Sequence, residues 1–308
     1  MSKRLPIAKM LTFGLLPSCI KKFCYRIQGN KIGHHVKLRA GAIIQSTKVF
    51  SIGDDTEIGL FTSVTGNEIR IGKRCKLRSA VVVNANKIAI GNDVTISETA
   101  IIRAGHLSPE SEIVIDDLVH VFPHATIDSS RCVHLAEECA VGPGCSVFTH
   151  GSYKNILDGY PVSYGDVSIG RRVELTYNVF VAPGVSIGDD TIVAYGSFVN
   201  KDLPAGVLAA GLPAVVKRTK DQFAPEPSLE EKKAILNGIV SEFKEYASFV
   251  GIDAAENSIQ IQENGVVIID GLYRFDVFNH SCDKPVGMLA EECRRFFSRY
   301  GIRFKIKE

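Results

Sequence analysis

His150 is a candidate catalytic residue because of its type and its position in the sequence. It ends a run of small and aliphatic residues, SVFT, and a long polar loop follows it. The ordinary pKa of imidazole is close to neutrality, so a histidine can act as a general base toward a reacting hydroxyl group. The alternative is a surface histidine that is hydrogen-bonded to its own loop. The chain contains 8 histidines, so the surrounding fold must distinguish the two interpretations.

A repeat over residues 30–220 determines where His150 points. The dipeptide Ile-Gly begins at positions 32, 52, 71, 90, 169 and 187. Between positions 90 and 169, Ile115-Asp116 and Leu135-Ala136 take the equivalent places. The base period is 18 residues, lengthened by insertions, and each period divides into three sixes. The first residue of each six is aliphatic and the fifth is small or β-branched.

Two inward positions in every six residues do not match the period of a helix, but they suit a short strand followed by a corner. Stacked coils place each inward side chain over its equivalent in the next coil. The pattern therefore predicts a mainly β protein, a parallel β-helix of about eight coils. The fifth residues expected in its core are Val36, Thr56, Cys75, Val94, Val119, Cys139, Val173 and Thr191 of the first sixes, and Ala42, Thr62, Val81, Ala100, Ala125, Cys145, Val179 and Ser197 of the second.

The insertions fall almost entirely in the third six of a coil, which places the loops on one edge of the predicted prism. Short insertions lie near 46–51, 105–114 and 128–134, and a long one lies at roughly 151–167. Insertions on one face of a repeat protein often mark the binding face. His150 is the fourth residue of a third six, so we expect it to point outward just before the longest loop.

The flanking segments differ from the repeat. Residues 1–29 contain an apolar run between basic residues, interrupted by Pro17. The run is too short to span a membrane and lacks a signal-peptide cleavage site. We expect a short helical cap over the open end of the repeat, with contact to a membrane surface as the alternative.

Residues 222–308 are expected to form a small α+β module with two helices and about four strands. Ser228 and Glu231 have capping-box spacing before a helix over 229–249. Asn264-Gly265 predicts a hairpin turn, and Gly301 is expected to end a second helix. The domains are therefore 1–29, 30–220 and 222–308.

Composition restricts the function. The 36 basic and 34 acidic residues give a formal charge of +2, which does not support nucleic-acid binding. The 8 cysteines form no CxxC pair and no zinc-ligand spacing, so reduced thiols in a cytoplasmic protein are expected. An alternative location is the inner face of the membrane, as a peripheral protein without an integral span.

The segment THGSYKNILDGYPVSYGDVSIGRRVELTYNVFVAPGVSIGDDTIVAYGSFVNKDLPAGVLAAGLPAVVKR starts at Thr149. It contains a His followed by a loop, then Ile-Gly-x-x-Val, Pro-Gly-Val-x-Ile-Gly, Gly-Ser-x-Val and Gly-x-Pro-Ala. These motifs resemble the left-handed parallel β-helix, hexapeptide-repeat acyltransferases, and look most like the O-acetyltransferases of sugars and surface polysaccharides. The resemblance covers residues 30–220.

The resemblance implies a homotrimer with acetyl-CoA between neighbouring prisms. It implies direct acetyl transfer to a sugar hydroxyl of a polysaccharide or glycan precursor, without a metal or a covalent acyl-enzyme. His150 matches the general base. The last two coils would hold the pantetheine arm, and nearby cations would hold the CoA phosphates. The residues implied for CoA are Ala182, Tyr195, Gly196, Ser197, Lys201, Lys217 and Arg218.

A histidine base usually needs an acceptor for its other ring nitrogen. Candidates are Asp158 and Asp166 in the loop and Glu174 at the start of the next coil, with solvated carboxylates as the alternative. Tyr153 could stack on a sugar ring or anchor the loop. His124 could line the acceptor end of the cleft.

Three other functions stay open at this point. The chain could be an N-acetyltransferase acting on an amino nucleotide sugar. A γ-carbonic-anhydrase-like zinc enzyme would use His120 or His124 together with His150 as ligands. A non-enzymatic trimeric scaffold would bind a partner through the C-terminal module.

Overall fold

The computed structural model describes residues 6–105, 107–151, 154–252 and 258–307. The chain divides into two compact units, Met1–Ala224 and Pro225–Glu308. The first unit contains the repeat and the second contains the C-terminal helices and a small sheet.

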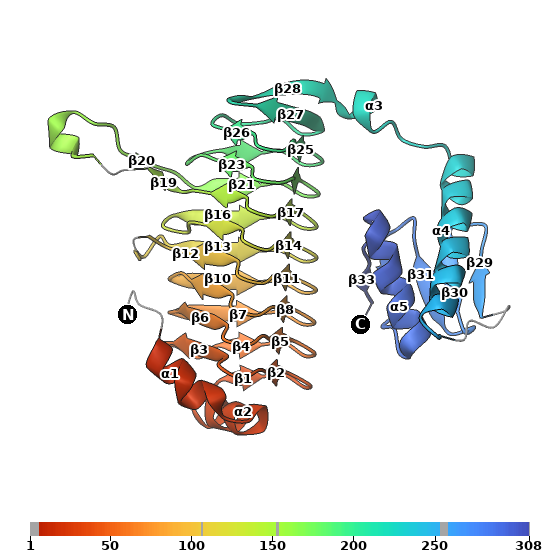
Figure 1. Ribbon diagram of the computed structural model, residues 1–308, viewed down its shortest axis with the longest axis horizontal. Coiled ribbons are helices and arrows are strands. Elements are labelled where there is room, and N and C mark those ends of the chain that lie inside the picture. Colours follow the sequence, from red (N-terminus) through yellow and green to blue (C-terminus); the bar gives the residue numbers. More distant parts are fainter. Residues whose placement is uncertain (1–5, 106, 152–153, 253–257, 308) are drawn as a thin grey trace. The chain divides into compact units, whose positions relative to one another are not determined.

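Three parallel sheets run along the repeat, and each coil contributes one strand to each of them (Figure 1). The first sheet consists of β1 (Lys31–Ile32), β4 (Ser51–Ile52), β7 (Glu68–Ile71), β10 (Lys87–Ile90), β13 (Glu112–Ile115), β16 (Cys132–Leu135), β21 (Val167–Ile169) and β24 (Ser186–Ile187). The second consists of β2 (Lys37–Leu38), β5 (Glu57–Ile58), β8 (Lys76–Leu77), β11 (Thr95–Ile96), β14 (His120–Val121), β17 (Ala140–Val141), β22 (Glu174–Leu175), β25 (Ile192–Val193), β27 (Val207–Gly211) and β28 (Ala214–Thr219). The third consists of β3 (Ile43–Ser46), β6 (Ser63–Gly66), β9 (Val82–Asn84), β12 (Ile101–Arg103), β15 (Thr126–Ile127), β18 (Ser146–Val147), β23 (Phe180–Val181) and β26 (Phe198–Val199).

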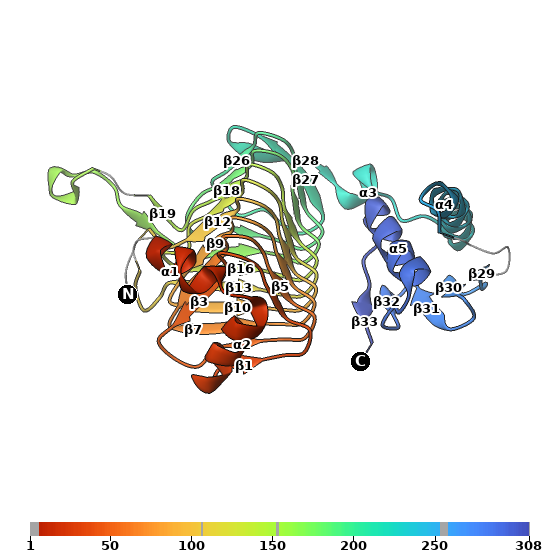
Figure 2. The same cartoon turned by 60° about the horizontal axis from the view of Figure 1, so that its bottom comes forward.

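The core confirms the repeat. All sixteen fifth-position residues are buried, and so are the aliphatic residues that start each six. The register stacks equivalent residues, for example Ile96 between Leu77 and Val121. The parallel β-helix predicted from the sequence is therefore present, and aliphatic side chains fill its interior. Figure 2 shows the stacked coils of the backbone from a second direction.

The corner between the second and third sheets has one conformation in successive coils. Ala80, Thr99, His124 and Asn178 all have positive φ there, at 58°, 60°, 61° and 54°. A non-glycine residue in this region costs about 1–2 kcal/mol, so the stacking of coils must stabilise it. His124 is accordingly a corner residue of the coil.

The longest insertion leaves the stack as a hairpin. β19 (His150–Gly151) pairs antiparallel with β20 (Ser163–Tyr164), and the 3-10 helix η2 (Ile156–Asp158) lies between them. In Figure 1 this hairpin projects from the side of the coils. His150 is thus the residue at which the chain departs from the prism.

The N-terminal segment folds against the first coil. It comprises α1 (Ile7–Leu11), the 3-10 helix η1 (Phe13–Leu15) and α2 (Ser18–Ile27). The Lys21 Nζ donates to the carbonyls of Gly14 and Arg39, at 2.9 and 2.6 Å. The Tyr25 hydroxyl donates to the Ile44 carbonyl at 3.0 Å and accepts from the Ile44 N–H at 2.9 Å. These bonds fix α2 over the end of the β-helix.

The second unit has its own core of aromatic and aliphatic side chains that includes Phe243, Phe275 and Phe297. Its elements are α4 (Leu229–Phe249), β29 (Ile259–Ile261), β30 (Val266–Ile269), β31 (Tyr273–Asp276), β32 (Ser281–Cys282), α5 (Met288–Phe297), the 3-10 helix η3 (Ser298–Tyr300) and β33 (Lys305–Ile306). The capping box of Ser228 and Glu231 starts α4 as predicted. The sheet has five strands rather than about four, since Ser281–Cys282 forms an extra short strand. α3 (Lys220–Phe223) belongs to the first unit.

Candidate functional site

His150 is paired with a buried carboxylate. Its Nδ1 lies 2.6 Å from Oδ2 of Asp128, and the Asp128 residue is only 4% exposed. Asp128 directly follows β15 and His150 follows β18, the next strand of the third sheet. The parallel register of these two strands brings the side chains together from neighbouring coils.

Asp128 is held by other donors as well. Its Oδ1 accepts from the Gly105 N–H at 3.0 Å and from the Ser130 hydroxyl at 2.8 Å. Its Oδ2 also accepts from the Thr149 N–H at 3.2 Å and the Thr149 hydroxyl at 2.8 Å. Burial alone would raise the pKa of Asp128, but the hydrogen bond from His150 and the other three sets of donors lower it below its ordinary value. The carboxylate is therefore ionised at neutral pH.

The ionised carboxylate determines the tautomer of His150. A carboxylate without a proton only accepts, so Nδ1 must carry the hydrogen of the shared bond. In the neutral ring Nε2 then carries the lone pair. This is the arrangement in which a histidine can take a proton at Nε2 while the carboxylate stabilises the resulting positive charge.

The His150 ring is constrained by Tyr164 and by Gly105. The Tyr164 ring is stacked on it, with centroids 6.0 Å apart and planes 19° apart. Gly105 lies close by, since a Cβ built on it would be 2.9 Å from Cε1 of His150. The Arg131 guanidinium lies 5.6 Å from the centroid of the Tyr164 ring. The hairpin therefore supplies one wall and the 105–114 insertion supplies another.

The acceptors considered from the sequence have other surroundings. Asp166 accepts from the Cys132 N–H at 3.1 Å. Asp158 is exposed in η2, and Glu174 is exposed on β22 of the second sheet. None of these three is the residue bonded to Nδ1 of His150, which is Asp128. Tyr153 lies outside the described residues.

Asp128 was missed in the sequence because it begins an irregular insertion and is 22 positions from His150. The signal that could have found it is the register of third sixes. Ile127 pairs with Val147, so the residues that follow these two strands must share one edge of the prism. A carboxylate and a histidine at that edge are within reach of each other.

His124 belongs to the corner and not to the pair. Its Nδ1 lies 2.7 Å from the hydroxyl of Thr99, the equivalent corner residue one coil earlier. Nε2 of His120 lies 2.9 Å from the Ser97 hydroxyl, and the His120 ring stacks on the Phe122 ring. Among the described residues of a single chain, no group of three His, Cys, Asp or Glu side chains is arranged to hold a metal ion.

The backbone groups considered for CoA are partly used within the coils. The Ala182 N–H donates to the Val199 carbonyl at 2.8 Å, and the Gly196 N–H donates to the Tyr177 carbonyl at 3.0 Å. The Ser197 side chain is buried, donates to the Ala194 carbonyl at 2.6 Å and accepts from the Gly211 N–H at 3.1 Å. The Ser197 hydroxyl is therefore a core group, and only backbone groups near this residue are left to face a pantetheine arm.

The other residues considered for CoA are on the surface. Tyr195 is 71% exposed at a turn of the last complete coil. Lys201, Lys217 and Arg218 are exposed, the last two on β28. Within the described ranges none of the three forms an ion pair, so their charges are available to an anionic ligand.

An aromatic column on the outer face of the third sheet was not anticipated. The rings of Phe148 and Phe180 are stacked with centroids 5.2 Å apart, and Phe180 meets Phe198 edge-on at 5.4 Å. Phe148 is two positions from His150, so the column leads away from the His150–Asp128 pair along the last coils. The column forms an apolar surface close to His150 in the sequence and in the stack of coils.

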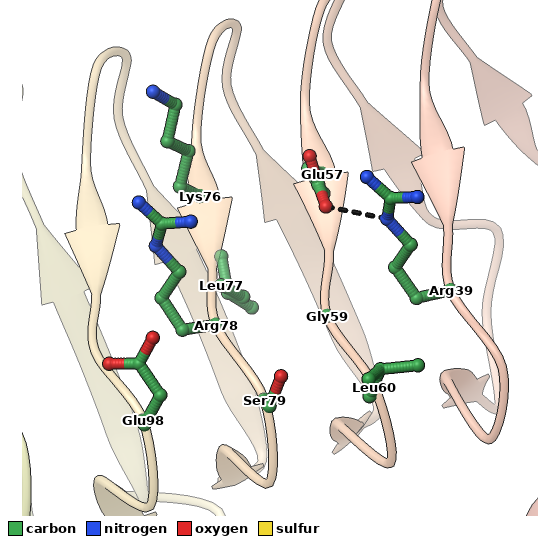
Figure 3. A pocket seen from close by; sticks show the side chains of 9 residues that line it. All are labelled: Arg39, Glu57, Gly59, Leu60, Lys76, Leu77, Arg78, Ser79 and Glu98. Carbon is green, nitrogen blue, oxygen red and sulfur yellow. Dashed lines mark hydrogen bonds and ion pairs between the residues drawn. The ribbon is translucent and has the colours of Figure 1, made fainter.

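A separate hollow of about 230 Å³ lies on the outer face of the second sheet and is drawn in Figure 3. Glu57 lies between Lys37 and Lys76 in the register and forms an ion pair with Arg39 at 2.7 Å. Alternating charges on adjacent strands stabilise a sheet surface. None of the residues expected to act in catalysis or CoA binding lines this hollow.

Comparison with known proteins supports the assignment of the repeat. No protein-family model matches the chain. It is 43% identical over 70 residues to the putative colanic acid biosynthesis acetyltransferase WcaF of Escherichia coli, covering 23% of this chain and 38% of the relative. It is 44% identical over 95 residues to the galactoside O-acetyltransferase of Escherichia coli, covering 30% of this chain and 47% of the relative.

Among solved structures, the chain is similar to the polysialic acid-specific acetyltransferase NeuO, at 20% identity and a TM-score of 0.40, covering 64% of this chain and 93% of that one. The alignments to the two curated relatives span less than half the length of each relative. The repeat region, which folds as a β-helix, is thus similar in sequence to these two acetyltransferases.

Proposed function

We propose that the chain is an acetyl-CoA-dependent O-acetyltransferase that transfers an acetyl group to a sugar hydroxyl of a polysaccharide or glycan precursor. The observation that carries the proposal is the bond between His150 Nδ1 and the ionised Asp128 carboxylate at 2.6 Å. Similarity to a relative named as a galactoside O-acetyltransferase supports a sugar hydroxyl as the acceptor.

In the proposed reaction, His150 Nε2 takes the proton of the acceptor hydroxyl as its oxygen bonds to the thioester carbonyl carbon. The carbon–sulfur bond then breaks, and His150 returns the proton to the departing sulfur, so CoA leaves as the thiol. Asp128 stabilises the positively charged ring between the two transfers. A positioned general base contributes about 10²- to 10⁴-fold to the rate.

Direct transfer without an acyl-enzyme is consistent with the environment of Cys145, the cysteine nearest to His150 in the sequence. Burial raises the pKa of Cys145 to about 11, because its thiol is enclosed in the core of the coil. A thiol with so high a pKa is protonated at neutral pH and is a poor nucleophile. We therefore assign no acyl-enzyme to Cys145.

The proposal places acetyl-CoA along the last coils of a homotrimer. Lys201, Lys217 and Arg218 would bind its phosphates, because they are exposed cations at that end of the β-helix. Phe148, Phe180 and Phe198 would form an apolar wall beside the pantetheine arm. Tyr195 would border the same channel from the turn before Gly196.

The test uses the full chain with acetyl-CoA and a panel of galactosides, oligosaccharides and amino sugars. Thiol release measures turnover, and calorimetry measures CoA binding. His150→Ala is expected to lower kcat by at least about 10²-fold while CoA binding is retained. His134→Ala is the matched control, because His134 also pairs with a carboxylate, Asp116, at 2.9 Å. Turnover of His150→Ala close to that of the unchanged chain would refute the assignment of His150 as the general base. Acetylation of amines but not of hydroxyls would show that the acceptor is an amino sugar.

A further inference from the structure

The outer face of α2 exposes a row of large apolar side chains. Ile20, Phe23 and Ile27 are 43%, 64% and 69% exposed, and their spacing of three and four residues places them on one side of the helix. Lys21 and Tyr25 lie on the opposite side and are buried against the first coil. Burial of an apolar face is normally what stabilises an amphipathic helix, yet here polar anchors hold the helix and the apolar row is left outside.

α1 exposes apolar side chains as well. Ile7 and Leu11 are four positions apart and both are exposed. Leu15 of η1 is exposed as well. The end of the unit formed by Ile7–Ile27, which we call the cap face, therefore presents apolar side chains from both helices and from the turn between them.

The charges around the cap face have one sign. The first 53 residues contain no Asp or Glu and ten of the chain's 36 basic residues. These ten are Lys3, Arg4, Lys9, Lys21, Lys22, Arg26, Lys31, Lys37, Arg39 and Lys48. The rest of the chain holds the other 26 basic residues and all 34 acidic ones. The near-balanced total charge therefore conceals a basic end and an acidic remainder.

Few of these charges are neutralised locally. Arg39 and Lys48 form ion pairs with Glu57 and Glu68 of the next coils. In the part of the chain that the structure describes, Lys9, Lys22 and Lys31 form no ion pair. An apolar helical face bordered by uncompensated cations is the arrangement that lies in the interface of an anionic bilayer.

We propose that the cap face binds the surface of an anionic phospholipid bilayer, with Ile20, Phe23 and Ile27 inserted at the level of the headgroups. A second copy of this chain is a poorer occupant, because two such faces would bring their uncompensated cations together. No described helix is long and apolar enough to cross a bilayer, so this contact is with one surface. The proposal is independent of the acetyl transfer proposed above.

The experiment measures sedimentation of the full chain with vesicles. One set contains phosphatidylcholine alone and the other contains phosphatidylcholine with phosphatidylglycerol. The chain is expected to bind the anionic vesicles and to be released by high salt. Ile20→Ser, Phe23→Ser and Ile27→Ser combined should weaken binding by about tenfold or more, since burial of apolar area drives insertion. Lys9→Gln with Lys22→Gln should weaken it by roughly fivefold per charge.

The matched control replaces three exposed apolar residues of the second unit, Leu272→Ser, Val286→Ser and Met288→Ser, which are 70%, 61% and 70% exposed. It should bind as the unchanged chain does. Circular dichroism checks that each variant is folded. Absence of binding to anionic vesicles, equal binding to both vesicle types, or unimpaired binding by the triple variant of α2 would each overturn the proposal. Self-association that depends on Phe23, without vesicle binding, would show that a second copy occupies the face.

Discussion

The Asp128 carboxylate and the His150 imidazole meet at 2.6 Å across two neighbouring coils. Asp128 directly follows β15 and His150 lies three residues after β18, and these two strands are paired in parallel register, so the backbone hydrogen bonds of the β-helix bring the two residues together. Asp128 is further fixed by the Gly105 N–H and the Ser130 hydroxyl. The pair is therefore preorganised before any substrate arrives, which is what a positioned base requires.

Asp128→Asn should lower kcat by at least about 10²-fold, the lower end of what a positioned general base contributes. An amide can present an N–H to Nδ1 and favour the wrong tautomer. The KM for acetyl-CoA should stay close to its original value, since Asp128 is buried away from solvent. Steady-state kinetics of the single variants and of the double variant with His150→Ala measure this. If the two residues act as one unit, the double variant is no slower than His150→Ala alone.

Asp116→Asn is the matched control for that change, because Asp116 holds His134 in a similar bond at 2.9 Å. It should leave kcat unchanged. Equal losses in the Asp116 and Asp128 variants would mean that both changes act on the fold and that Asp128 has no particular role in positioning His150.

Gly105→Ala should displace the His150 ring. The added Cβ would lie 2.9 Å from Cε1 of His150, which is closer than non-bonded carbon atoms approach each other in proteins. A shift of the base by a fraction of an ångström is expected to lower kcat by about tenfold, because misplacement by 1 Å can cost about 10²-fold. Kinetics give the rate and thermal unfolding gives the stability. Gly238→Ala serves as the comparison, since nothing lies within 4 Å of a Cβ there and its φ is not positive. Gly238 lies in α4 of the second unit, so this change does not touch His150. An unchanged rate for Gly105→Ala would contradict the packing argument.

Tyr164→Ala should lower kcat by roughly two- to tenfold, because a stacked aromatic pair contributes about 0.5–1.5 kcal/mol. Tyr164→Phe should restore most of the rate, since the ring that contacts His150 at a centroid distance of 6.0 Å is retained. The comparison of the two variants in the thiol-release assay separates the ring from the hydroxyl. A Phe variant as slow as the Ala variant would assign the effect to the hydroxyl group.

The stability of the first unit should depend on the ionisation of Asp128. The pKa of its carboxyl is lower in the folded chain than its ordinary value, because the hydrogen bonds from His150, Gly105 and neighbouring donors outweigh the effect of burial. The unfolded chain therefore binds the proton first as the pH falls. The stabilisation is present above the unfolded pKa and disappears as the pH falls through the folded value.

The measurement is the difference in melting temperature between the unchanged chain and Asp128→Asn, from about pH 6 down to about pH 3, the range that contains the ordinary carboxyl pKa. The difference should be greatest at the upper end and shrink toward the lower end. All other carboxylates are shared by the two proteins and cancel in the comparison. A difference that is constant over the whole range would show that Asp128 does not contribute through its charge.

The sequence predicts the β-helix well because its constraint is periodic. Each fifth residue, from Val36 to Ser197, must fit the same narrow interior, and all sixteen are buried. The capping box of Ser228 and Glu231 is a local pattern, and the sequence predicts it correctly as the start of α4. Both features depend on contacts between residues whose separation in the sequence is short or regular.

The partner of His150 depends on contacts of a different kind. Asp128 opens an insertion that breaks the period, so counting along the chain places it in a loop, whereas strand register places it beside His150. Ser197 shows what the period does predict. Its place as a fifth residue requires its side chain to lie in the core, and the side chain is buried there.

The hydrogen bonds of α2 have a consequence for assembly. The first coil of any stack has backbone groups with no coil beneath them, and such open rungs can template the addition of another chain. Here the Tyr25 hydroxyl both donates to and accepts from the backbone of Ile44, as a neighbouring strand would. Lys21 occupies the carbonyls of Arg39 and Gly14 in the same region. The helix therefore covers an edge of the β-helix, and its detachment would expose backbone groups with which another chain could pair.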